Sequence, residues 1–201
     1  MSESHGLAPT LRDLLVETFA VVLGIVLGLG ATAWVEARSE RAHTRAVRAF
    51  IVGEVTANRD SVAASRDYHA GLMDSLYTRM GPDGTAPSVR LFSRGFIHPA
   101  TTLSTAWDAA VATDALTAMD YDEVLAFSRV YAAQQRYGES SREGGRVIYA
   151  ELLARGTPGL AENYRNLFSL IAASRYLETD LIREYDRALA AVRADSMQAP
   201  G

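Results

Sequence analysis

The chain has 201 residues, with 20 basic and 24 acidic side chains and a formal net charge of −4. That balance is too weakly acidic to indicate binding to a polyanion, so nucleic acid is not an expected partner. Every basic residue is arginine, and cysteine is absent. This composition excludes lysine Schiff bases, P-loop lysines, thiolate nucleophiles and cysteine-ligated metal centres.

One long apolar stretch lies near the N-terminus. No residue from 18 to 35 carries a charge, and the apolar residues just before Glu17 extend the stretch to about the 20 residues that cross a ~30 Å hydrocarbon core. We expect an N-terminal tail at 1–13 and a transmembrane helix at 14–35. A cleaved signal peptide is the alternative, because residues 31–33 read Ala-Thr-Ala. The helical pattern continues without a break past that point and favours a retained anchor.

Small side chains recur every four positions along the expected span, at Ala20, Gly24, Gly28 and Thr32. This spacing places them on one face and includes a G-x-x-x-G pattern, which lets a second helix approach closely. The sequence therefore predicts that this stripe packs against another transmembrane helix, although glycine and alanine are also common in membrane helices without such a role. Glu17 and Trp34 lie near the two boundaries and are the expected interfacial residues.

The basic residues around the span bear on its orientation. Arg12 precedes the span, whereas several arginines follow it within a short distance, at Arg38, Arg41, Arg45 and Arg48. The positive-inside rule then leans slightly toward a cytoplasmic C-terminal domain. Glu36 and Glu40 dilute the second cluster, so the side of the membrane stays open.

The rest of the chain has a helical period. We expect a helical soluble domain at 36–195, followed by a tail at 196–201. Its predicted parts are a stalk helix at 36–80, a loop at 81–100 and helices at about 101–117, 121–153 and 160–195. The fold class is all-α: one N-terminal transmembrane helix continues into the stalk and packs in an antiparallel helical bundle.

Local signals set these boundaries. "GPDGTAP" at 81–87 is a predicted turn, and residues 88–99 have no helical period, which indicates a loop or an extended segment across the bundle. Asp120 is a predicted N-cap with Glu123 completing a capping box, and Gly156 is a predicted helix stop.

No pattern of catalytic, cofactor-binding or metal-binding residues is recognised. The histidines have no partner at ligand spacing, and the nearest pair, Asp67 and His69, faces different directions on a helix. An acidic run is better explained by caps and solvated helix faces; it comprises Asp108, Asp114, Asp120 and Asp122. Trp107 is expected to be a core packing anchor rather than a platform for a ligand.

Two stretches resemble a widespread, uncharacterised family of bacterial single-span proteins. "LLVETFAVVLGIVLGLGATAWVEARSER" is similar to its N-terminal signature, and "TAWDAAVATDALTAMDYDEVLAFSRVY" is similar to its T-x-W/Y-x-x-L-x-x-S-G-x-L segment and following helix. The matching positions are Thr105, Trp107, Thr113, Leu116 and Tyr131. Asp114 stands where the family pattern has glycine. The resemblance implies a bacterial inner-membrane, single-pass protein with a helical soluble domain, and it supplies no catalytic residue.

The expected function is that of a non-catalytic accessory subunit. It would anchor and stabilise a larger inner-membrane complex, for which a photosynthetic or electron-transfer complex is one host. No histidine lies in the span, which counts against direct ligation of chlorophyll. The alternative is a homodimeric sensor that binds a small ligand or peptide between its helices. The expected partners are therefore the bilayer and either the other helices of a complex or a second copy.

Overall fold

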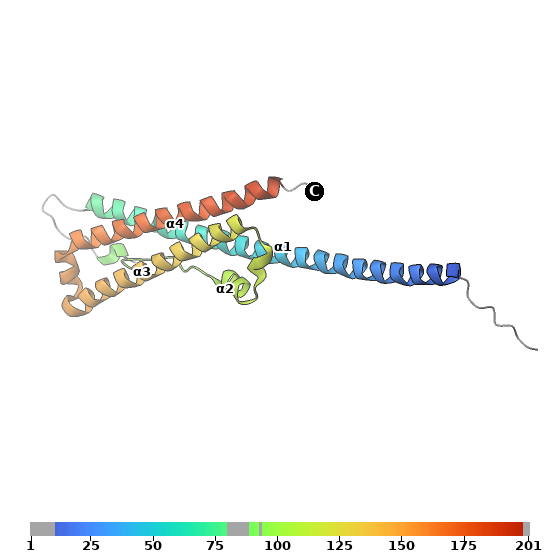
Figure 1. Cartoon of the computed structure of the whole chain (residues 1–201). Helices are drawn as coiled ribbons and strands as arrows, with labels where there is room; N and C mark the ends of the chain where they lie inside the picture. Colours follow the sequence, from blue (N-terminus) through green and yellow to red (C-terminus); the bar gives the residue numbers. More distant parts are fainter. Residues whose placement is uncertain (1–10, 80–88, 93, 199–201) are drawn as a thin grey trace, which may run out of the picture. The chain divides into compact units, whose positions relative to one another are not determined.

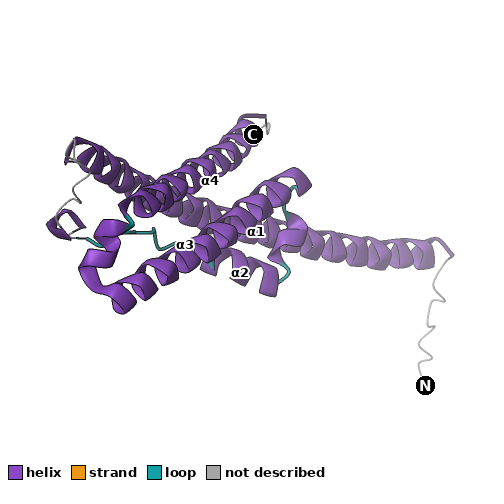
Figure 2. Ribbon diagram, turned by 90° about the vertical axis from the view of Figure 1, so that its left-hand side faces the viewer, coloured by secondary structure: helices purple, strands orange, loops and turns teal. Residues whose placement is uncertain are grey.

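The described part of the protein is helical. A computed structural model describes residues 11–79, 89–92 and 94–198, in which helices are joined by short loops without any strand (Figure 2). The α-helices are α1 (Leu11–Arg79), α2 (Thr105–Ala112), α3 (Tyr121–Glu162) and α4 (Tyr164–Gln198), and the 3₁₀ helices are η1 (Val89–Phe92) and η2 (Ala115–Ala118) (Figure 1). The predicted all-α class is confirmed. The predicted turn at 81–87 lies outside the described residues.

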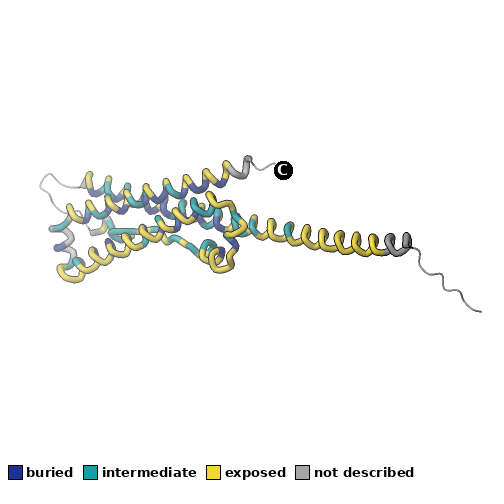
Figure 3. Tube along the Cα trace, viewed as in Figure 1, coloured by how far each residue is buried: buried dark blue, intermediate teal, exposed yellow. Residues whose placement is uncertain are grey.

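The chain divides into two compact units, Met1–Ala46 and Val47–Gly201. The described residues of the first unit belong to α1, and those from Thr18 to Glu36 are all exposed (Figure 3). By length and composition α1 is the one described helix able to cross a membrane, and none of its apolar window is buried. The exposed, uncharged stretch of α1 from 18 to 35 has about the length that a hydrocarbon core accommodates.

The second unit is a helical bundle with a shared apolar core. Buried residues recur at helical spacing on each long helix, including Ile51, Val55 and Val62 of α1, Phe127 and Val130 of α3, and Leu181, Tyr185 and Leu189 of α4. A second cluster joins Leu72 and Leu76 to Ile148, Leu167 and Ile171. These side chains come from stripes about one-third of each helix wide, so the helices pack through one face and leave the other in solvent.

The region predicted as one helix at 101–117 is different in the structure. Residues 101–104 are irregular, α2 begins at Thr105, and the helix ends before Asp114, whose φ of 53° is left-handed. Residues 101–104 stay outside the helix because side chains of other helices bind the backbone of Leu103, as described below. The early end follows from Asp114, since a left-handed residue cannot continue an α-helix. This is also the position where the resembled family has glycine, the residue for which a left-handed backbone costs least.

The break predicted at Gly156 is present inside α3. Gly156 has φ 66° and ψ −165°, so the helix leaves its regular path there and one further turn follows before Asn163. Asn163 connects the two sides of the break: its Nδ2 donates to Glu151 Oε1 at 3.0 Å. The helix predicted to end near 153 therefore reaches the break at Gly156, and a short continuation ends at Glu162.

We expect Gly156→Ala to lower the free energy of unfolding by about 1–3 kcal/mol, because this φ and ψ combination is nearly restricted to glycine. Thermal unfolding of the full chain in detergent, followed by circular dichroism, measures the change. Gly145→Ala is the matched control on the same helix: a Cβ there meets no atom within 4 Å, and alanine should be neutral or stabilise by up to about 1 kcal/mol. Equal effects of the two variants would contradict the assignment.

Candidate functional site

The most unusual feature of the second unit is the segment 95–106, here called the strap. It lacks regular structure up to Ser104, and its backbone is bound by side chains of the helices. At the centre, Asn58 Oδ1 accepts the Leu103 N–H at 2.9 Å, and Asn58 Nδ2 donates to the Leu103 carbonyl at 2.7 Å. Gln134 Nε2 donates to the same carbonyl at 2.8 Å. Two amide side chains from α1 and α3 thus satisfy both backbone groups of one strap residue.

Three more strap amides donate to side chains. The Ala106 N–H donates to Glu54 Oε2 at 2.9 Å, and the Ala100 N–H donates to the Tyr137 hydroxyl at 2.9 Å. The His98 N–H donates to His69 Nε2 at 3.1 Å. These acceptors come from α1 and α3, so the strap is held to both helices.

His69 and Glu178 form a polar pair in the centre of the bundle. Both side chains are 0% exposed, and His69 Nδ1 lies 2.9 Å from each Glu178 carboxylate oxygen. Because His69 Nε2 accepts the His98 N–H, the hydrogen-bond pattern assigns the ring proton to Nδ1, which donates to Glu178. The Tyr137 hydroxyl also donates to Glu178, at 3.3 Å. The pair therefore connects α1, α3, α4 and the strap.

A carboxylate that orients an imidazole is also the arrangement found in hydrolytic triads. In those enzymes the outer imidazole nitrogen faces a nucleophile, whereas here it accepts a backbone N–H of the strap. No solvent reaches either side chain. The geometry therefore supports a structural role for the pair, which is to hold the strap against the bundle. In the described ranges, no group of three or more acidic, histidine or cysteine residues is placed to hold a metal ion.

Three buried tyrosines complete this polar network. Tyr131 donates to Glu54 Oε1 at 2.6 Å, and Tyr185 donates to Gln134 Oε1 at 2.7 Å. Burial is the largest cause that raises the pKa of each hydroxyl well above the ordinary tyrosine value, for Tyr137 as well. Nearby carboxylates add to the effect on the pKa, Glu54 for Tyr131 and Glu178 for Tyr137. No buried side-chain polar atom in the described residues lacks a hydrogen-bond partner.

The stripe predicted in the span is exposed along α1, at Ala20, Gly24, Gly28 and Thr32. A Cβ at either glycine would meet nothing within 4 Å. The Thr32 hydroxyl donates to the Gly28 carbonyl at 3.1 Å, which satisfies that hydroxyl within its own helix. The stripe is therefore available to a neighbouring helix.

The predicted interfacial residues lie at the two ends of the span. Trp34 is 64% exposed, and the Arg38 guanidinium lies 5.7 Å from the centre of its ring, at cation–π distance. An exposed tryptophan beside an arginine is typical of the boundary between hydrocarbon and water. The side chain of Glu17 lies outside the described residues.

The capping box predicted at the start of α3 is only partly present. Asp120 accepts hydrogen bonds from the backbone N–H groups of Asp122 and Glu123, as predicted for an N-cap. Glu123 does not complete the box. Its buried carboxylate instead accepts the Arg48 guanidinium, which also donates to the Val192 carbonyl. A residue predicted to act locally thus joins α3 to α1 and α4.

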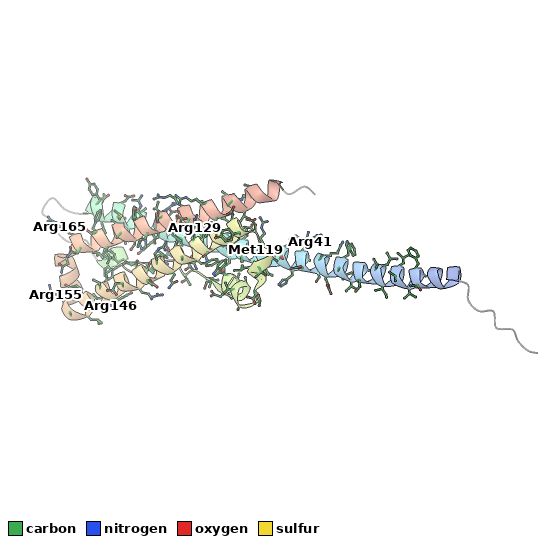
Figure 4. All side chains as sticks on the ribbon, in the orientation of Figure 1. Arg41, Met119, Arg129, Arg146, Arg155 and Arg165 are labelled. Atoms are coloured by element: carbon green, nitrogen blue, oxygen red, sulfur yellow. The ribbon has the colours of Figure 1, made fainter. Side chains whose placement is uncertain are left out.

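Trp107 packs against the core as predicted, stacked on Tyr131 with ring centres 5.1 Å apart and planes 20° from parallel. It also lines an open hollow of about 530 Å³ between the strap, α2 and α3. A second hollow, of about 720 Å³, lies between the C-terminal part of α3 and the start of α4. Arg146 and Arg155 of α3 line this second hollow (Figure 4), and both pair with carboxylates, Glu143 and Glu151 respectively.

Sequence reasoning missed the polar network, although part of its signal is present. Asn58, Ser65 and His69 follow the buried stripe of α1 at the same spacing as the apolar residues Ile51 and Val62. Polar residues on a core stripe predict buried hydrogen-bonding partners. Which partners they meet depends on the strap and on α4, and local periodicity does not specify that.

Comparison of the chain with protein-family models, with curated proteins and with solved structures gives no match. The geometry of the site therefore has to support any functional conclusion by itself.

We expect Glu178→Ala to destabilise the second unit by about 3–5 kcal/mol, because it leaves the His69 Nδ1–H and the Tyr137 hydroxyl buried without their acceptor. Thermal unfolding of the full chain measures this loss. Glu184→Ala on the same helix is the control, since its carboxylate pairs with the largely exposed Arg187 and should contribute less than about 1 kcal/mol. A Glu178 variant as stable as the Glu184 variant would contradict the structural role.

Stability should also fall in alkali. The folded-state pKa of Tyr131, Tyr137 and Tyr185 is raised, so above about pH 10 the unfolded chain loses tyrosine protons that the folded chain retains. Each tyrosine then removes up to about 1.4 kcal/mol of stability per pH unit. The chain has no lysine or cysteine to titrate in this range.

Unfolding measured between about pH 8 and 12 checks this expectation. Tyr185→Phe should reduce the alkaline slope, since one of the tyrosines whose pKa burial raises is gone. Tyr149→Phe, at an exposed tyrosine, is the control and should leave the slope unchanged. A stability that does not vary with pH across this range would show that these hydroxyls are not buried.

Proposed function

We propose that the protein is a single-span membrane-anchored accessory subunit, whose helical unit has a structural rather than a catalytic role within a larger membrane complex. The observation that carries the proposal is the exposed apolar part of α1, with its stripe of small residues. Within a bilayer such a stripe permits close contact with a second helix, and helix packing there is driven by this contact rather than by the hydrophobic effect.

The polar network of the second unit supports the same proposal. Its most distinctive groups, Asn58, His69 and Glu178, direct their hydrogen bonds to the strap and to each other. None of them offers a reactive atom to solvent, since each is at most 2% exposed. Polar networks that are fully satisfied inside a core make a domain rigid and specify one packing.

The finer parts of the proposal rest on the sequence. A bacterial inner membrane is what the family resemblance implies, and the arginines after the span lean slightly toward a cytoplasmic helical unit. A homodimer that associates through the same stripe is the second candidate, because the stripe would serve either kind of partner.

Native purification in mild detergent, followed by mass spectrometry, tests the proposal. We expect the wild-type chain to be recovered with other membrane proteins at fixed stoichiometry. Gly24→Leu and Gly28→Leu should abolish this association, since a leucine on the stripe prevents close approach. Gly30→Leu is the matched control: it lies on the opposite face of the helix, and its Cβ also meets no atom within 4 Å.

The competing outcomes are distinct. Recovery of a homodimer that Gly24→Leu disrupts would favour the second candidate over the accessory subunit. Recovery of a monomer without partners from the wild-type chain would contradict both.

A further inference from the structure

The hollow beside Trp107 has the volume of a small-molecule site. Its volume of about 530 Å³ lies within the usual range for such sites, about 300–1,000 Å³. Its lining combines the ring of Trp107 with polar and charged side chains from the strap, α2 and α3, among them Ser104, Asp108, Gln135 and Arg142. The strap forms part of the wall, and the polar network described above holds it in place.

Arg142 supplies a positive charge that no carboxylate of the described residues neutralises: it has neither an ion pair nor a hydrogen bond to a carboxylate there. Its guanidinium lies back along α3 over Gly138, where an added Cβ would come within 3.7 Å of Arg142 Nη1. Side chains on a helix point toward its N-terminus in this way. The guanidinium therefore lies along the wall of the hollow, which Gly138 also lines.

The arginines of the larger hollow differ in this respect. Arg146 donates to both carboxylate oxygens of Glu143, at 3.0 and 2.8 Å, and Arg155 lies 3.4 Å from Glu151. Their charges are already paired, whereas the guanidinium N–H groups of Arg142 can donate to an acceptor on a ligand. The Trp107 indole N–H likewise has no acceptor in the described part of the chain, although the ring is half-buried. Both groups can donate to a carboxylate.

The lining of the hollow also includes a negatively charged side chain. Asp108 lines it and accepts the Ser104 hydroxyl at 2.7 Å through one carboxylate oxygen. Glu54 lies behind the wall, where it accepts the Tyr131 hydroxyl. A carboxylate in the lining with free acceptor capacity favours a positively charged group in the ligand.

We propose that this hollow binds a small zwitterion of the α-amino acid class, with its carboxylate at Arg142, its ammonium group at Asp108 and its side chain against Trp107. The opposite charges of Arg142 and Asp108 in one hollow select for a ligand that carries both charges. The site is independent of the proposed accessory role, because it lies within the second unit and does not involve the span.

Fluorescence of Trp107 tests the proposal in the full chain. The chain has two tryptophans, so a Trp34→Phe background leaves Trp107 as the only reporter. Titration of the detergent-solubilised protein with each standard L-amino acid should give a saturable change for at least one of them, with a Kd below about 1 mM. The N-acetyl form of that amino acid lacks the ammonium charge and its amide lacks the carboxylate, and each should bind about tenfold more weakly or worse.

Variants in the same background separate the two ends of the ligand. Arg142→Gln should weaken the amino acid by about tenfold or more and leave the amide form unaffected. Asp108→Asn should weaken the amino acid and leave the N-acetyl form unaffected. Arg129→Gln removes an exposed arginine of α3 that does not line the hollow (Figure 4), and it should change nothing.

Two results would overturn the assignment. One is the absence of saturable binding by any amino acid to the parent protein. The other is binding that Arg142→Gln leaves intact, or binding that does not distinguish the amino acid from its N-acetyl and amide forms. Either result leaves the test of the accessory role unaffected, since that test reads association through the span.

Discussion

The binding of the strap's backbone by side chains of α1 and α3 is the constraint on which the rest of the second unit depends. An irregular segment that packs against a helical core brings polar N–H and carbonyl groups to its surface, and each one that loses contact with water costs free energy unless it is paired. Asn58 satisfies both groups of Leu103, and Glu54 and His69 satisfy amides on either side. These side chains replace water as hydrogen-bond partners of the backbone, so the strap can pack against the helices.

The other polar groups of the core follow from this arrangement. Once His69 Nε2 accepts a strap amide, its Nδ1 needs an acceptor, and Glu178 of α4 provides it. Gln134 donates to Leu103 through its nitrogen and accepts from Tyr185 through its oxygen. Each bond orients the next, so α4 is connected to the strap without a direct backbone contact. Cooperative networks of this kind make one packing much more favourable than its alternatives.

The sequence predicted what depends on local periodicity and failed where a residue's partner is distant. The all-α class, the N-cap at Asp120 and the break at Gly156 depend on spacing and on single-residue preferences, and they were correct. The start of the helix expected from 101 to 117 was wrong because Asn58 and Gln134, 45 and 31 residues away from Leu103, bind its backbone and keep that segment irregular. The sequence near His69 offers only Asp67 as a neighbouring partner, whereas its actual partner Glu178 lies 109 residues along the chain.

Hydrogen exchange of the strap amides in the full chain tests this account most directly. The amides of His98, Ala100, Leu103 and Ala106 donate to core side chains, so they should exchange as slowly as the buried helical amides near Phe127 and Tyr185. The amides of Thr101 and Thr102, which have no acceptor in the described residues, should exchange much faster. Uniformly fast exchange across the strap would contradict the claim that buried side chains hold it against the core.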